Sequence, residues 1–159
     1  MKRNRIIFVV VIILILVVLG VLLLTNRSKK VEKFHLEDEY YNELGLVTVE
    51  PDDFEKLLSE KKNFLLFIYN DVCSFKIPCD TIYDKVAKDN KFEILQMNFR
   101  EFKDTSLYGK VKYAPSVIVI KKGKIVDFLD AESNEDLDRY QDGDKFLDWL
   151  SNYIYFEKE

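Results

Sequence analysis

An uncharged apolar run near the N-terminus constrains this chain more than any other feature. The sequence IIFVVVIILILVVLGVLLL, from Ile6 to Leu24, is nineteen residues long. A helix of this length spans the hydrocarbon core of a bilayer. A cleaved signal peptide has a shorter apolar region and a small-residue cleavage site, which LLLTNRSKK lacks. The predicted organisation has four parts: an N-terminal tail (1–5), a transmembrane signal anchor (6–24), a linker (25–45) and one folded domain (46–157).

The numbers of basic residues on the two sides of the apolar run are nearly equal, with three before it and four after it up to Lys33, so they favour neither membrane orientation strongly. A very short N-terminal tail is most simply kept in the cytoplasm, which leaves the domain outside. The chain has two cysteines, and an even number is what an oxidising compartment retains. We therefore predict a single-pass protein of the cell membrane with an extracytoplasmic domain.

The charge pattern excludes some classes of partner. The net charge is −4, and lysines alternate with acids along the domain, which is typical of a solvated surface. Nucleic-acid binding requires a basic patch, so no nucleic-acid partner is predicted. Two cysteines without a nearby histidine leave a zinc site short of ligands, so no metal site and no cofactor are predicted.

From Gly45 onward, apolar patterns predict alternating strands and helices in the order βαβαβαββα, an α/β arrangement. The predicted strands are Leu46–Val49, residues 63–70, Phe92–Phe99 and a hairpin that turns at Lys122 and Gly123. Four helices are predicted. One begins at Pro51, one ends near Asp89, one lies within Thr105–Val111, and the last follows the hairpin and is broken near Gly143.

Four stretches in this order resemble the thioredoxin family: DDFEKLL, NFLLFIYNDVC, YDKVA and YGKVKYAPSVIVIKKGKIV. The resemblance spans the domain and implies a thioredoxin-like sandwich. It implies that Cys73 stands where the family has its attacking cysteine, and that the Ala114–Pro115 bond is cis and lies opposite. It also implies that Val72, Ala114 and Pro115 hold an extended substrate segment by strand addition.

The chain departs from the family at three positions near this site. Val72 replaces the tryptophan before the first cysteine, Phe67 replaces a buried aspartate, and Gln96 replaces the lysine that partners it. In the family the aspartate assists proton transfer when the second thiol resolves a mixed disulfide. The resemblance therefore implies an oxidase or slow isomerase rather than a fast reductase. His35, in the predicted linker, is a poor substitute for this acid.

The two cysteines are separated by five residues in DVCSFKIPCD, whereas the usual redox motif has two. If a helix begins at Ser74, Cys73 and Cys79 lie about 9 Å apart along its axis. A disulfide needs α-carbons within about 7 Å, so that helix would keep the thiols apart. Pro78 costs about 3 kcal/mol inside a helix but is favoured in its first turn.

A helix that begins near Pro78 leaves residues 74–77 as a loop that lets the two thiols meet. Cys79 is then half-buried on one helix face with three apolar residues: Ile82, Tyr83 and Val86. The helix N-terminus and Lys76 would both favour the thiolate of Cys73.

Two functions fit these residues. The first is a membrane-tethered thiol–disulfide oxidoreductase that acts on thiols or disulfides of exported proteins through a redox-active Cys73/Cys79 pair, which a membrane redox partner recycles. The alternative is a non-catalytic thioredoxin-like binding module, or a secretion accessory protein, with a structural disulfide. That module could offer a contact surface on its aromatic-rich terminal helix: Trp149, Tyr153, Tyr155 and Phe156. A peroxidase is a poor fit, because FIYNDVC lacks the proline and the hydroxyl residue of peroxiredoxin-type sites.

Overall fold

A computed structural model describes residues 32–71 and 77–158 of the chain. The chain divides into two units, Met1–Lys30 and Val31–Glu159, and the second is described below. The predicted anchor over residues 6–24 lies outside the described residues, as do Val72, Cys73 and Lys76. None of the helices in the described ranges is both long and apolar enough to cross a membrane.

One five-stranded sheet with the strand order β1-β3-β2-β4-β5 forms the centre of the domain. Strands β1, β3 and β2 are parallel, and β4 and β5 run antiparallel to their neighbours. The strand bounds are β1 Leu46–Thr48, β2 Phe64–Tyr69, β3 Ile94–Asn98, β4 Ser116–Lys121 and β5 Lys124–Phe128. The predicted mixed α/β fold is thereby confirmed.

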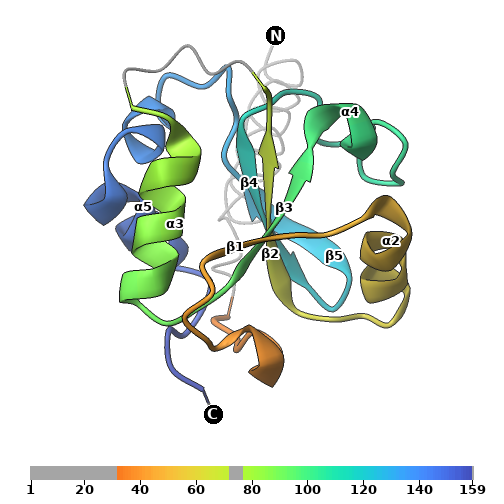
Figure 1. Ribbon diagram of the computed structural model, residues 1–159, viewed down its shortest axis with the longest axis horizontal. Helices are drawn as coiled ribbons and strands as arrows, with labels where there is room; N and C mark the ends of the chain where they lie inside the picture. Colours follow the sequence, from red (N-terminus) through yellow and green to blue (C-terminus); the bar gives the residue numbers. More distant parts are fainter. Residues whose placement is uncertain (1–31, 72–76, 159) are drawn as a thin grey trace, which may run out of the picture. The chain divides into compact units, whose positions relative to one another are not determined.

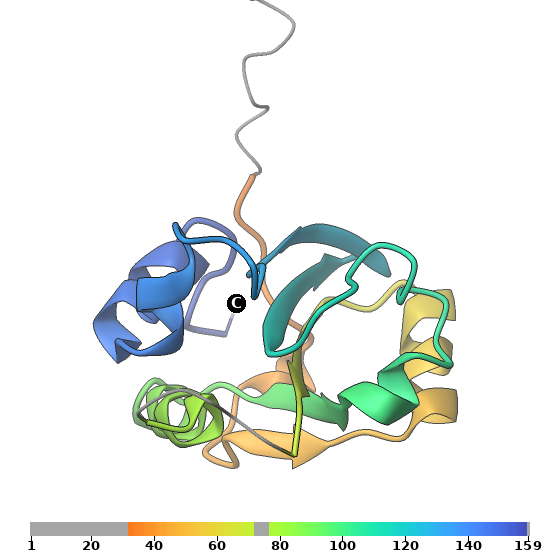
Figure 2. The same cartoon turned by 90° about the horizontal axis from the view of Figure 1, so that it is seen from above.

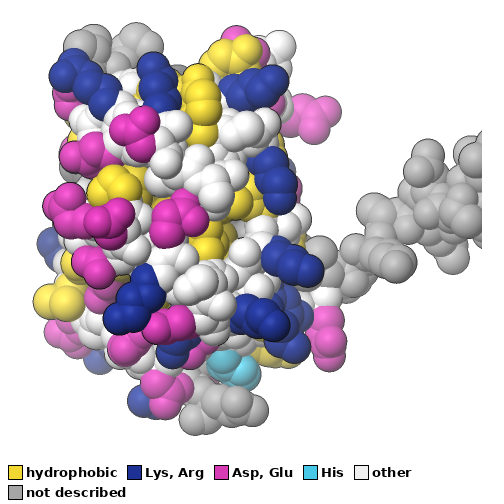
Figure 3. Space-filling view, turned by 90° about the vertical axis from the view of Figure 1, so that its right-hand side faces the viewer, with side chains coloured by type: hydrophobic (Ala, Val, Ile, Leu, Met, Phe, Trp, Pro, Cys, Tyr) yellow, Lys and Arg dark blue, Asp and Glu magenta, His cyan; other side chains and the backbone are white. Residues whose placement is uncertain are grey.

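Helices cover both faces of this sheet, as Figures 1 and 2 show. Helices α2 (Pro51–Ser59) and α4 (Phe99–Phe102) lie on one face, and α3 (Cys79–Asp89) and α5 (Gly143–Leu150) on the other. Because both faces are covered, β2 is apolar along almost its whole length rather than alternating. On the side that includes α2 and α4, acidic and basic side chains are interspersed (Figure 3), as the charge pattern predicted.

The helix predicted within Thr105–Val111 is misplaced. Residues 105–111 form turns, and the helix at this place in the fold, α4, follows directly from β3. The side chain of Asn98 caps α4 by accepting a hydrogen bond from the backbone N–H of Arg100 at 2.9 Å. A cap at the last residue of the strand therefore starts the helix earlier than the apolar pattern indicates.

The packed domain begins well before residue 46. Phe34, Leu36 and Tyr40 are buried in the core, and Tyr40 lies in a short 3-10 helix, η1 (Asp38–Tyr40). The backbone N–H of Phe34 donates to Tyr153 O at 2.9 Å, and Tyr155 N donates to Phe34 O at 3.0 Å. The linker predicted over residues 25–45 is therefore part of the folded domain from Phe34 onward.

The hairpin turns where the sequence predicts, but the terminal helix is shorter than predicted: α5 ends at Leu150, so Tyr153, Tyr155 and Phe156 lie beyond it. Lys122 and Gly123 both have positive φ, and a Cβ at Gly123 would lie 2.2 Å from the main-chain oxygen of Leu58. Only glycine fits such a close approach. The break predicted near Gly143 separates a 3-10 helix, η2 (Leu137–Tyr140), from α5, which Asp142 caps.

Candidate functional site

The helix that carries Cys79 begins next to Pro78, as the position of this proline in the sequence predicts. Helix α3 starts at Cys79, and Pro78 precedes it with φ −58° and ψ 131°. Ile77 lies outside the helix as well. A continuous helix from Ser74 through Cys79 is therefore excluded. Cys73 lies outside the described residues, so the pairing of the two thiols stays a prediction.

Cys79 is only 2% exposed, and thus more deeply buried than the half-buried position that the sequence predicts. Its helix face includes Tyr83, which is fully buried, with Ile82 and Val86 partly buried. The ring of Tyr83 lies edge-on against the ring of Phe67, with centroids 5.2 Å apart. The first turn of α3 therefore faces the sheet directly, which explains the deeper burial.

A pocket of about 300 Å³ brings Cys79 together with Pro115 at the carboxyl end of β2. The Ala114–Pro115 bond is cis, as the resemblance implied. Among the described residues, eight line the pocket: Phe67, Tyr69, Asn70, Asp71, Pro78, Cys79, Asp80 and Pro115. Of the predicted site residues, the structure brings together Cys79 and Pro115, while Val72, Cys73 and Lys76 lie outside the described ranges.

The floor of this pocket is apolar at the position where the family has its buried acid. Phe67 is 1% exposed and stands opposite Gln96 in the sheet register. The Gln96 side chain donates to the hydroxyl of Thr48 at 3.3 Å. Neither position supplies an ionisable group, so any proton transfer at Cys79 must use another group or water.

Hydrogen bonds and an ion pair fix the polar residues at the rim of the pocket. The Asn70 side chain donates to the main-chain oxygen of Ala114 at 3.2 Å, which ties the end of β2 to the loop before β4. The carboxylate of Asp71 accepts from Asn98 at 2.7 Å and pairs with Arg100 at 3.0 Å. The rim therefore has a fixed hydrogen-bonding pattern on the β2 side.

Three consecutive residues after β5 contact three other parts of the site, and the sequence patterns did not predict them. Tyr140 OH donates to Pro115 O at 2.9 Å, and Arg139 O accepts from Tyr83 OH at 3.3 Å. The Gln141 side chain bonds the backbone of Ile77 through both its amide nitrogen and its oxygen. These contacts join residues far apart in the sequence, so no local spacing signals them.

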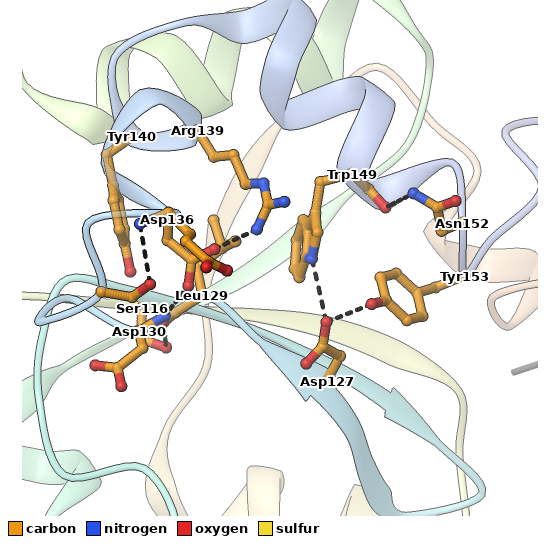
Figure 4. Close-up of polar contacts among 12 residues, drawn as sticks. Ser116, Asp127, Leu129, Asp130, Asp136, Arg139, Tyr140, Trp149, Asn152 and Tyr153 are labelled. Carbon is orange, nitrogen blue, oxygen red and sulfur yellow. Dashed lines mark hydrogen bonds and ion pairs between the residues drawn. The ribbon is translucent and has the colours of Figure 1, made fainter. Parts of the chain in front are cut away.

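Burial raises the pKa of Tyr140 well above its usual range, and the negative charges of Asp136, Cys79 and Asp130 raise it further. Asp136 accepts from the backbone N–H of Asp130 at 2.9 Å and pairs with Arg139 (Figure 4). Tyr140 is therefore neutral at physiological pH and acts at this site as a hydrogen-bond donor.

Comparison with known proteins finds similar solved structures, but no matching family and no matching curated protein. Similar solved structures include thioredoxin f2 of Chlamydomonas reinhardtii, with 19% identity and a TM-score of 0.47, covering 67% of this chain and 94% of that one. A thioredoxin mutant from Halobacterium salinarum has 14% identity and a TM-score of 0.47, covering 74% and 96%. A thioredoxin mutant from Entamoeba histolytica has 14% identity and a TM-score of 0.47, covering 60% of this chain and 96% of that one.

With identities of 14–19% and TM-scores of 0.47, this similarity assigns neither a family nor a function to the chain. Independently of it, the described unit has parallel strands β1, β3 and β2, an antiparallel β4–β5 pair and helices on both faces. A cis-proline bond leads into β4 and a cysteine starts the helix after β2. The domain therefore has a mixed α/β fold with one five-stranded sheet, as the resemblance in sequence implied.

Proposed function

We propose that this protein is a membrane-tethered thiol–disulfide oxidoreductase that acts on exported proteins through Cys73 and Cys79. The observation that carries the proposal is the pocket in which Cys79 and Pro115 meet at the start of α3. The late start of α3 supports it too, because Ile77 and Pro78 lie outside the helix, which excludes the continuous helix from Ser74 that would keep the two thiols apart.

The proposed reaction transfers two electrons from a substrate dithiol to the cysteine pair. A substrate thiolate attacks the sulfur of Cys73 in the Cys73–Cys79 disulfide, and Cys79 leaves as a thiolate. A second substrate thiolate then attacks the substrate sulfur of the mixed disulfide and releases Cys73. The substrate gains one disulfide, the protein holds two thiols, and a membrane redox partner reoxidises them.

Each cysteine has a distinct part in this scheme. In the reverse direction, which an isomerase also uses, Cys73 attacks a substrate disulfide and Cys79 resolves the mixed disulfide. A resolving thiol is typically shielded, and Cys79 is buried beside the start of its helix. The apolar Phe67 provides no assisting base, which favours an oxidase or isomerase over a rapid reductase.

The membrane part of the proposal rests on the apolar sequence from Ile6 to Leu24. Its extracytoplasmic orientation rests on the short N-terminal tail and the even cysteine count. Labelling intact cells with a membrane-impermeant thiol reagent, after reduction, tests this orientation: Cys73 should react without lysis, whereas the buried Cys79 should not. Reaction only after lysis would place the domain in the cytoplasm.

The activity is tested with the full chain in detergent micelles and a reduced, unfolded protein as substrate. The wild type should speed substrate oxidation in the presence of oxidised glutathione. Cys73→Ser should abolish this effect, and Cys79→Ser should instead accumulate a mixed disulfide with an oxidised substrate. Equal rates for the wild type and Cys73→Ser would overturn the proposal.

The second candidate is a binding module with a structural disulfide, and the deep burial of Cys79 favours it to some degree. The terminal aromatic residues give it less support. Trp149 is buried, and its indole N–H donates to Asp127 at 3.2 Å within the domain. Capture of an envelope partner that persists in the double variant Cys73→Ser, Cys79→Ser would favour the binding module.

A further inference from the structure

A second hollow lies beside the proposed redox pocket, between α3 and the start of α5. Its volume is about 430 Å³. We call it the α3–α5 groove. Apolar and acidic side chains both line it, and those that matter here are Ile77, Ile82, Val86, Leu147, Asp142 and Asp144. The groove thus offers an apolar floor with carboxylates at one end.

Ile77 presents a large apolar side chain from a fixed backbone. The side chain is 45% exposed. The Gln141 amide nitrogen donates to Ile77 O at 2.9 Å, and the Gln141 amide oxygen accepts from Ile77 N at 3.4 Å. Because both backbone groups already have partners, Ile77 is held in place while its side chain remains accessible.

Adjacent residues of one short segment line the groove and the redox pocket. Ile77 lines the groove, whereas Pro78 and Cys79 line the pocket. The α-carbons of Ile77 and Cys79 are at most about 7 Å apart, since consecutive α-carbons are 3.8 Å apart. An extended segment advances about 3.3 Å per residue. A segment whose cysteine is bound in the pocket can therefore reach the groove with a side chain two or three positions away.

The charge of the groove selects among such segments. Asp142 and Asp144 have no ion-pair partner among the described residues, and the Asp142 carboxylate is fixed by the backbone N–H groups of Asp144 and Lys145. Lys145 itself pairs with Asp138, and the acid at the far end of the groove, Asp89, pairs with Lys85. The net charge at the α5 end is therefore negative and complements lysine or arginine.

We propose that the α3–α5 groove is a specificity subsite of the redox pocket. It accepts a substrate segment that carries a large aliphatic side chain followed by lysine or arginine, two or three positions from the reacting cysteine. The proposal rests on the proposed oxidoreductase function, and it names the class of polypeptide that this function serves.

Binding of peptides that cannot react tests the groove apart from the chemistry. The probes are fluorescent peptides of the form Ser-Gly-Leu-Lys-Lys, Ser-Gly-Leu-Glu-Glu and Ser-Gly-Gly-Lys-Lys, with serine in place of cysteine. Their Kd values for the full chain in detergent micelles are measured by fluorescence anisotropy. The Leu-Lys-Lys peptide should bind roughly five-fold more tightly than either of the others at low salt. Its advantage over the glutamate peptide should shrink at high salt.

Matched variants separate the groove from general effects of charge and hydrophobicity. Asp144→Lys should remove the preference for lysine over glutamate, whereas Asp53→Lys, an exposed first-turn acid of α2, should leave it unchanged. Ile77→Ser should remove the preference for leucine over glycine, whereas Leu44→Ser, at an exposed apolar residue that does not line the groove, should not.

The outcomes distinguish this proposal from the proposed function. Equal Kd values for the three peptides, or an equal response to Asp144→Lys and Asp53→Lys, would overturn the subsite. Exchange with a small uncharged disulfide, hydroxyethyl disulfide, reports on the cysteine pair without the groove. A wild-type protein that exchanges with this disulfide but binds all three peptides alike retains the proposed function and loses the subsite.

Discussion

The hydroxyl of Tyr140 donates a hydrogen bond to the main-chain oxygen of Pro115 at 2.9 Å, from a side chain that is 1% exposed. This bond joins η2, after the hairpin, to the loop that forms one wall of the redox pocket. The next residue, Gln141, bonds the backbone of Ile77, two residues before Cys79. The turn around Tyr140 thus connects the loop that carries the cis-proline to the segment that leads into α3.

Loss of the Tyr140 hydroxyl should destabilise the domain. Tyr140→Phe leaves the Pro115 oxygen without this donor in a part-buried place, which costs about 1–2 kcal/mol of unfolding free energy. Urea denaturation followed by circular dichroism measures the change. Tyr113→Phe is the matched control, because Tyr113 is 47% exposed and should lose little. Equal stability of the two variants would contradict a structural role for the Tyr140–Pro115 bond.

The contact between α3 and α5 depends on glycine at position 143. A Cβ at Gly143 would lie 2.8 Å from a methyl carbon of Val86, closer than such carbons pack. Gly143→Ala should therefore destabilise the domain by about 1–3 kcal/mol through overpacking. Val86→Ala removes the opposing methyl groups, so the double variant should lose less than the sum of the single variants. Strict additivity in urea denaturation would show that the two residues do not press on each other.

The extended N-terminal boundary predicts which fragments fold. A fragment of residues 32–159 keeps Phe34, Leu36 and Tyr40, whereas one of residues 46–159 exposes the surfaces that these side chains cover. Removal of several large core side chains costs about 2–5 kcal/mol each, which exceeds much of the stability of a small domain. The shorter fragment should show little cooperative thermal unfolding and the longer one a sharp transition. Similar transitions would show that residues 34–45 are a linker after all.

Alkaline pH should weaken the domain through Tyr153. Burial raises the pKa of Tyr153 above its usual value of 10.0, and its hydrogen bond to the Asp127 carboxylate raises it further. Figure 4 shows Asp127 accepting from both Tyr153 and Trp149. Because the folded state holds its proton more tightly, this contribution is complete below pH 10 and declines as pH rises above it.

The test compares urea denaturation at several pH values from neutral to strongly alkaline. Tyr153→Phe should flatten the decline in unfolding free energy above pH 10, whereas Tyr155→Phe, at an exposed tyrosine, should leave the slope as in the wild type. An unchanged slope in Tyr153→Phe would contradict the assigned role of Tyr153.

The elements that the sequence predicts well have local causes. Pro51 and Pro78 mark helix starts, because proline is tolerated only at that end of a helix, and the buried strands β2 and β4 are unbroken apolar runs. The misplaced short helix has a cause that periodicity does not register, a cap from Asn98 directly at the end of a strand. Residues 34–45 were missed as part of the domain because their partners, such as Tyr153, lie more than a hundred positions away.

The site could be predicted only in part for the same reason. The strand–helix junction and the cis-proline follow from motifs within short stretches, and these place Cys79 and Pro115. The contacts of Arg139, Tyr140 and Gln141 join three segments that only the fold brings together. The depth at which Cys79 is buried depends on the packing of Tyr83, on the same helix, against Phe67 of β2, and no residue spacing encodes this packing.

The most direct test of the central claim is a redox titration of the Cys73–Cys79 pair. The full chain in detergent micelles is equilibrated with glutathione buffers and more strongly reducing dithiothreitol buffers, and free thiols are counted by the mass shift after alkylation. The account predicts one two-electron transition with a midpoint above about −300 mV, as for redox-active disulfides. A pair that stays oxidised until well below that potential would show a structural disulfide and contradict the proposed function.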